Sequence, residues 1–441
     1  TGPISESEYT ALHKKNKDYT QNDTVGKAGL EQYYETYLRG KNGEQKFYID
    51  NVGRISEIIS STDSVAGDDL YLSIDADLQK ATYLALQNEI AAIVYSNIKS
   101  GEIPINDVYT ALIGNSVINT EHFSKSKASD TEKSVLSVFK SRQKTTLGKI
   151  KQELTSSPEA LNTMSDEVLD EFTYIISMLK DDQVLLKNEI DTSDSVYQKW
   201  KDQKISPKEY LNYCITQHWI DISQLNVDEK YADSTEVYDA LCKYILKNIK
   251  TDTEFSKIIY QYMITRGEIS PRQLCLILFD QGVLDYDDAT VNKLKNGSLS
   301  PRDFLMKKIY NIEITPAQLA LEPCIGSCVV TDEKTGEIRA MVSYPGYDSN
   351  KLANGVDSEY FASLQHDKSS PLLNYATQQK TAPGSTFKLV SATAGLAENV
   401  ITTSDQIRCT GIYNDISNKP KCWIYPGSHG PVSYTHLRAH E

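Results

Sequence analysis

Residues 93–317, about half of the chain, repeat one helix-start pattern and constrain the fold more than any other segment. Four times a Ser or Thr precedes a proline, in ISPKEY, ISPRQL, LSPRDF and ITPAQL. Ser and Thr are favoured helix N-caps, and proline suits the first helical position because its missing N–H would be unpaired there anyway. A Glu, Gln or Asp then falls at the third position, where it can reach back to the cap. We therefore expect helices capped at Ser206, Ser270, Ser300 and Thr315.

The segments on either side of this tract mix strands with helices. LYLSIDADLQKATYLALQ predicts a short strand over 70–74 and a helix capped near Asp75. In GSCVVTDEKTGEIRAMVSYPGY, two β-rich runs at 327–331 and 337–343 flank the turn sequence DEKTG, which predicts a hairpin. The expected fold class is α+β with a large all-α insertion.

Composition excludes several classes of protein. The formal net charge of −14 argues against nucleic-acid binding, which needs clustered Lys and Arg. No apolar run reaches the length of a membrane span. The seven cysteines, an odd number, cannot all pair within one chain and show no C-x-x-C spacing. Cys409 and Cys422 lie in a loop and could form a disulfide in an oxidising compartment, an alternative that stays open.

The stretch TAPGSTFKLVSATAGLAENV points to chemistry. From Thr386 to Ala397 the only charged residue is Lys388, and an almost entirely apolar helix is normally buried. Ser385 lies three residues earlier on the same face, at or near the helix N-terminus. A serine hydroxyl becomes a nucleophile when a base takes its proton, and a lysine amine withdrawn from water can be that base. The pattern indicates acyl transfer.

The spacing alone is weak support for catalysis. S-x-x-K occurs elsewhere in this chain at positions best explained as helix surface, namely Ser96, Ser124, Ser137, Ser141 and Ser177. Around Ser385 the context differs, with a Pro-Gly entry, apolar residues on both sides of the lysine and a preceding β hairpin. The alternative is an N-cap serine beside a lysine that extends to solvent.

Several stretches, in order, resemble the class B penicillin-binding proteins, the D,D-transpeptidases that cross-link peptidoglycan. APGSTFKLVSA resembles their active-site serine motif, and VGKAGLEQYYETYLRG their N-terminal pedestal or dimerisation region. LYLSIDADLQKATYLAL resembles the start of their transpeptidase domain, and GSCVVTDEKTGEIRAMVSYPGYDSN its hairpin with the following P-x-Y-D-x-N segment. The resemblance implies a penicillin-binding, serine-transpeptidase-like fold.

The resemblance also implies roles. Ser385 would form the acyl-enzyme with the D-Ala-D-Ala stem peptide or with a β-lactam, and Lys388 would be its general base. The protein would act at the extracytoplasmic face of the bacterial membrane, held by an anchor helix outside this chain. Its partner would be a membrane glycosyltransferase of the divisome or elongasome. We divide the chain into a pedestal (1–68), the start of the transpeptidase domain (69–92), the helical insertion (93–317), the N-terminal part of the transpeptidase domain (318–432) and a non-native tail (433–441).

This sequence also departs from the family pattern. The family's S-x-N motif occurs nowhere, and the one KTG, at Lys334–Gly336, precedes the serine and is interpreted as hairpin turn. The tail SYTHLRAHE fits no family pattern, so we expect an inactive, C-terminally truncated fragment. Two other functions stay open: a β-lactamase or β-lactam sensor, which would share the acyl-serine chemistry, and a non-catalytic cell-wall scaffold.

No cofactor and no metal site is expected. His429, between glycine-rich turns, is interpreted as an exposed loop residue. His436 and His440 imitate a zinc pair but lack a third ligand. The acidic residues between 280 and 288 lack the order and the glycine of a calcium loop, which favours a solvated acidic loop.

Overall fold

The computed structural model describes residues 1–52, 54–156, 159–225, 227, 233–353, 356–422 and 424–432. Its elements are helices and antiparallel two-stranded sheets, which confirms the α+β class. The chain forms two compact units, 1–376 and 377–441. In the described part no helix is both long and apolar enough to span a lipid bilayer.

The N-terminal part of the first unit combines short helices with two strand pairs. Its small core consists of Ile4, Tyr19 and Val25, covered by Tyr9 and Leu12. A bulged hairpin leaves both strands exposed along their whole length. The elements are β1 (Gly2–Pro3), α1 (Glu6–Lys15), β2 (Thr24–Val25), α2 (Gly29–Tyr33), α3 (Glu35–Leu38), β3 (Glu44–Ile49) and β4 (Ile55–Thr62).

Helices follow from Ala76 to Leu319 around one continuous apolar core. All four predicted caps are confirmed: each side chain accepts the backbone N–H of the third helical residue. The helices are α4 (Ala76–Ser100), α5 (Ile105–Gly114), α6 (Asp130–Thr155), α7 (Asp166–Asp181), α8 (Ser195–Lys201), α9 (Pro207–Thr216), α10 (Ser234–Ile249), α11 (Thr253–Thr265), α12 (Pro271–Asp280), α13 (Asp288–Asn296), α14 (Pro301–Tyr310) and α15 (Pro316–Leu319), with 3₁₀ turns η1 (Thr120–Ser124), η2 (Leu161–Thr163) and η3 (Ile222–Gln224).

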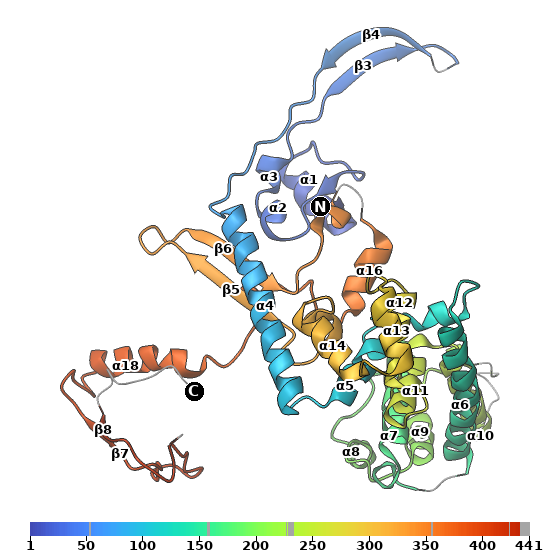
Figure 1. The fold of residues 1–441 in the computed structure, drawn as a ribbon. Coiled ribbons are helices and arrows are strands. Elements are labelled where there is room, and N and C mark those ends of the chain that lie inside the picture. Colours follow the sequence, from blue (N-terminus) through green and yellow to red (C-terminus); the bar gives the residue numbers. More distant parts are fainter. Residues whose placement is uncertain are drawn as a thin grey trace. The chain divides into compact units, whose positions relative to one another are not determined.

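The long helix α4 joins this helical part to the predicted hairpin. The hairpin is confirmed as β5 (Gly326–Thr331) and β6 (Ile338–Tyr344). Figure 1 shows α4 running from beside this hairpin to α14. The Gln79 side chain donates to the carbonyl of Met341 at 2.6 Å and accepts its N–H at 2.7 Å. This paired contact fixes α4 across the edge of β6.

The strand predicted over 70–74 is wrong. In the described part of the chain, two hydrogen bonds connect the end of this segment with β6: the Ser73 hydroxyl donates to the carbonyl of Ile338, and the N–H of the following Asp75 donates to the carbonyl of Arg339. Two hydrogen bonds near one end of the segment do not make a β-ladder. Asp75 itself caps α4 by accepting the N–H of Leu78, as expected.

The remaining elements lead into and form the second unit. After β6 come η4 (Ser349–Leu352), α16 (Ser358–His366) and α17 (Tyr375–Gln378), the last of which crosses from one unit to the next. The second unit then has a 3₁₀ turn, η5 (Gly384–Thr386), that runs directly into α18 (Phe387–Ala397). The antiparallel pair β7 (Ile407–Cys409) and β8 (Gly430–Val432) follows.

A buried charge cluster lies within the helical part. Arg142 donates to both carboxylate oxygens of Glu167, at 2.9 and 3.0 Å, and Arg266 donates to one of them at 2.6 Å. One turn further along α7, Glu171 is only 2% exposed, and its Oε1 has no hydrogen-bond partner. Burial first, and then the negative charge of Glu167, raise the pKa of Glu171 to about 8.

We expect this acid to make the helical part less stable as the pH rises. Because the pKa of Glu171 is raised on folding from 4.5 to about 8, the folded state holds the proton more tightly. Stability is therefore full below pH 4.5 and is lost as the pH rises through 8, by on the order of a few kcal/mol. Glu171→Gln should flatten the fall in melting temperature between pH 5 and pH 9, followed by circular dichroism. Glu189→Gln, at an exposed position, should change nothing; equal slopes for both variants would contradict the assignment.

Candidate active site and a cysteine–histidine cluster

Ser385 and Lys388 lie on either side of the junction between η5 and α18. Gly384, which precedes the serine, has φ +55°, a conformation that favours glycine, and this lets the loop turn into the helix. The hydroxyl of Thr386 donates to the carbonyl of Pro383 and closes the turn. Both side chains are half-buried. In a 3₁₀ turn, residues three apart lie on the same side of the chain.

The expectation that this helix is buried is wrong. No residue of α18 is buried, and Phe387, Leu389 and Val390 are 51%, 76% and 53% exposed. An apolar helix needs a large surface to pack on. In the described part of 377–432, the β7–β8 pair and the loops around it offer little such surface. One contact with the helix is that of Ile401 with Gly395. The withdrawal of Lys388 from water is thus partial.

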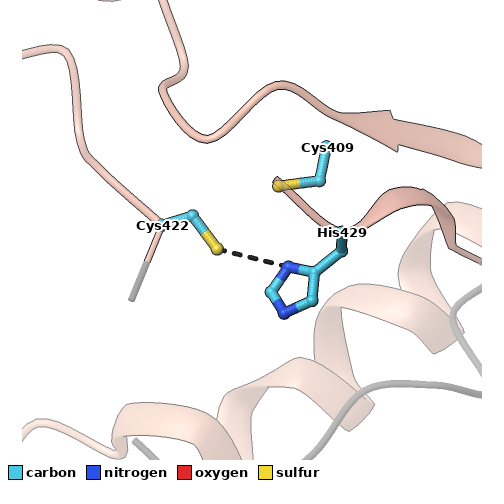
Figure 2. Close-up of side chains that lie close together, drawn as sticks. All are labelled: Cys409, Cys422 and His429. Atoms are coloured by element: carbon cyan, nitrogen blue, oxygen red, sulfur yellow. Dashed lines mark hydrogen bonds between the residues drawn. The ribbon is translucent and has the colours of Figure 1, made fainter. Parts of the chain in front are cut away.

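A second group of side chains gathers in the same unit. The register of β7 and β8 pairs Cys409 with Gly430, which brings His429 next to Cys409. Cys422 is brought close to Cys409 by two further backbone contacts. One is an isolated β-bridge between Ile412 and Lys421, and the other is a hydrogen bond from the Cys422 N–H to the carbonyl of Gly411. Figure 2 shows the three side chains pointing toward one another, with Cys422 Sγ 3.4 Å from His429 Nδ1.

This cluster has the donor set of a soft-metal site. One ligand atom from each of Cys409, Cys422 and His429 lies within 4.8 Å of the others. A hydrogen bond from the backbone N–H of His429, followed by one from its side chain, lowers the pKa of Cys409 to about 6. Two sulfurs and one imidazole are three of the four ligands that Zn²⁺ takes in structural sites. Both cysteines are free thiols here rather than a disulfide.

The sequence pattern does not reveal this cluster. From the sequence, Cys409 and Cys422 are a possible disulfide, His429 is a loop residue, and no metal site is expected. The spacing C-x12-C-x6-H was available, but it is longer and less regular than the familiar zinc patterns. Only the pairing of β7 with β8 shows that the three residues meet.

The other candidates for chemistry have structural roles or lie outside the described residues. The Lys334–Gly336 segment is the turn between β5 and β6, where Asp332 accepts the N–H groups of Lys334 and Thr335. Within the acidic stretch, Asp287 caps α13 and Asp280 accepts the hydroxyl of Ser129. His436 and His440 belong to the undescribed tail 433–441.

Comparison with known families separates the chain into two matched segments. Residues 1–72 match the penicillin-binding protein dimerisation domain, and residues 326–434 match the penicillin-binding protein transpeptidase domain. The second segment contains Ser385, Lys388 and the cysteine–histidine cluster. One chain thus contains two segments that match domains of penicillin-binding proteins.

Individual relatives agree. The peptidoglycan D,D-transpeptidase MrdA of Escherichia coli K12 is 39% identical over 100 residues, which are 23% of this chain and 14% of that protein. MrdA of Acinetobacter baumannii is 31% identical over 133 residues, 30% of this chain and 20% of the relative. PbpA of Mycolicibacterium smegmatis is 44% identical over 77 residues, 17% and 16% of the two chains. The chain thus matches at most a fifth of the length of these relatives.

We expect the cluster to bind one Zn²⁺ per chain. The purified protein, stripped with a chelator and titrated with Zn²⁺, should bind one equivalent, because three soft donors already converge. Cys409→Ser and Cys422→Ser should each weaken binding at least tenfold by removing a ligand, measured by competition with a chromophoric chelator. Cys328→Ser, outside the cluster, is the matched control. Unchanged affinity in both cluster variants would show that the site binds no zinc.

Proposed function

We propose that the protein is a peptidoglycan D,D-transpeptidase that works through an acyl-serine intermediate and is inhibited by β-lactams. The observation that carries the proposal is the half-buried pair Ser385 and Lys388, one turn apart, inside the segment that matches the transpeptidase domain. The relatives named above are peptidoglycan D,D-transpeptidases, which supports the same reaction. No nucleic acid and no cofactor takes part in it.

The reaction begins with proton transfer. Lys388 takes the proton of the Ser385 hydroxyl as Oγ attacks the carbonyl carbon of the penultimate D-alanine. The peptide bond to the terminal D-alanine breaks, and the leaving amine takes the proton back. The acyl group then passes to the amine of a second stem peptide. The negative oxygen of each tetrahedral intermediate accepts a hydrogen bond from the backbone N–H of Ser385 and from one further donor.

The arrangement of the chain supports a discontinuous transpeptidase domain. We infer that residues 69–92 and 318–432 belong to it, that 1–68 is the pedestal and that 93–317 is an insertion. The contacts between α4 and β6, across more than half of the sequence, support this division. The protein would act outside the cytoplasmic membrane, beside a membrane glycosyltransferase of the divisome or elongasome.

Two other functions share part of this chemistry. A β-lactamase or a β-lactam sensor would also acylate at Ser385, but the match of residues 1–72 to the dimerisation domain favours the transpeptidase. A non-catalytic scaffold would use the helical part alone. The rate at which penicillin is released from the acylated protein distinguishes a transpeptidase from a β-lactamase or a β-lactam sensor. The absence of any acylation would favour the scaffold.

We expect acylation to depend on both residues. In a version of the protein that also carries the S-x-N and K-[ST]-G motifs, Ser385→Ala should abolish labelling by a fluorescent penicillin. Lys388→Met should slow it by about 10² to 10⁴, the usual contribution of a general base. Ser391→Ala, on an exposed position of α18, and Lys380→Met are matched controls. Full-speed labelling of the Lys388 variant would refute the assigned role.

The 441-residue chain itself should label weakly or not at all. It lacks S-x-N, and its two K-[ST]-G matches both precede Ser385: Lys99–Gly101 ends helix α4, and Lys334–Gly336 is a hairpin turn. A quenched time course of penicillin labelling, read on a gel, compares this chain with the motif-complete version and tests this prediction. Labelling at a comparable rate would mean that the two motifs are unnecessary for acylation here.

A further inference from the structure

A cavity of about 320 Å³ lies between the C-terminal half of α4 and α14, within the first unit. Its volume is at the small end of the range for ligand pockets, roughly 300 to 1,000 Å³, and suits a single sugar-sized ring. Three basic side chains, one acid, one buried methionine and two tyrosines line it, namely Lys99, Arg302, Lys307, Asp303, Met306, Tyr95 and Tyr310.

The lining of this cavity has a net positive charge, whereas the chain as a whole is negative. The protein has a formal charge of −14, yet the cavity has three basic groups against one carboxylate. Asp303 accepts the hydroxyl of Ser300 at 2.7 Å, so its carboxylate already has a local partner. Among the described residues, the three cations form no ion pair, and the nearby Glu313 pairs instead with Lys308. The cavity is therefore a place where an anion would find partners.

Helix stabilisation does not explain these charges. Lys99 lies in the last turn of α4, where a cation is favourable, so it alone carries no weight. Arg302 is the second residue of α14, at the positive end of the helix dipole, where a cation is unfavourable. Arg272 stands at the same position of α12, so the weight of Arg302 lies in its place on the cavity wall, where among the described residues it forms no ion pair.

The tyrosines add a wall that a ring can contact. Tyr95 and Tyr310 meet edge to face, with ring centroids 5.2 Å apart at 61°. Tyr310 remains 65% exposed although it borders a cavity. Aromatic rings of this kind offer apolar faces with a polar tip, which suits a ligand that is itself part apolar and part hydroxylated.

We propose that this cavity binds a sugar ring that carries one anionic group, a carboxylate or a phosphate. The anion would contact Arg302, Lys307 and Lys99, and the ring would lie against Tyr310 and Tyr95. The choice of a sugar rather than a nucleotide rests on the proposed function, because an enzyme of cell-wall synthesis works among anionic glycans. A ligand there would contact both α4 and α14. It would thus link α14 to α4, the helix that is hydrogen-bonded to β6.

Calorimetric titration of the whole chain tests the proposal. The probes are N-acetylmuramic acid, N-acetylglucosamine 6-phosphate, uncharged N-acetylglucosamine, inorganic phosphate and AMP. We expect at least one charged sugar to bind with a Kd of about 1 mM, as fits a small ligand. The uncharged sugar and free phosphate should bind at least tenfold more weakly. The two charged sugars distinguish a carboxylate from a phosphate as the anion.

Variants separate binding from folding. Arg302→Ala with Lys307→Ala should weaken the charged sugar at least tenfold, and Tyr310→Leu at least threefold. Lys293→Ala with Lys295→Ala, on the exposed side of α13, should leave binding unchanged. Removing Arg302 should not lower the melting temperature, since alanine favours the helix and the lost cation opposed its dipole.

Three results would overturn the proposal: no binding of either charged sugar, free phosphate or AMP binding as tightly as the better sugar, or unchanged affinity in the double variant. Penicillin labelling is a separate measurement. Failure of acylation at Ser385 in the motif-complete version, with sugar binding intact in the 441-residue chain, would refute the proposed function and leave the cavity assignment standing.

Discussion

The paired hydrogen bonds between the Gln79 side chain and the backbone of Met341 connect two segments that the chain separates by the whole helical tract. An amide side chain that both donates to and accepts from one strand residue behaves like a short piece of neighbouring strand. Tyr83 packs beside Tyr344 at the same junction, and Leu86 and Ile90 lie against Gly326. The two ends of the helical tract therefore meet on α4. Because the entropy of closing a loop grows only slowly with its length, a long intervening segment with its own core costs little at such a point.

The two units differ in how many of their apolar side chains they bury. The helical part buries a continuous core and even carries a buried acid, Glu171, whose carboxyl has lost most of its water. In contrast, α18 exposes Leu389 and Val390 although it is the most apolar segment near the candidate serine. Burying such side chains gains about 1.5 to 3 kcal/mol each, so a covering surface would bind this helix strongly. The same surface would also cover the proposed site, because Lys388 lies in the first turn of this helix.

Local chemistry was predictable and long-range pairing was not. The caps at Ser206, Ser270, Ser300 and Thr315 follow from three or four consecutive residues, and all are present. The β5–β6 hairpin follows from two strands around one turn. The strand expected over 70–74 failed because its partner, β6, lies more than 260 positions away and offers only two bonds. The cluster of Cys409, Cys422 and His429 was missed for the same reason: a bridge and a strand register bring it together, and neither leaves a pattern in the sequence.

The sequence by itself determined the positions of the helices and the spacing of Ser385 and Lys388, because capping and the i, i+3 relation act within one turn of the chain. It also carried the motifs that resemble those of penicillin-binding proteins. Only the tertiary structure decided that α18 is exposed, that the cysteine–histidine cluster forms and that α4 and α14 line an open basic cavity. Burial, donor sets and cavities depend on which surfaces meet, and that is settled by packing between residues far apart in the chain.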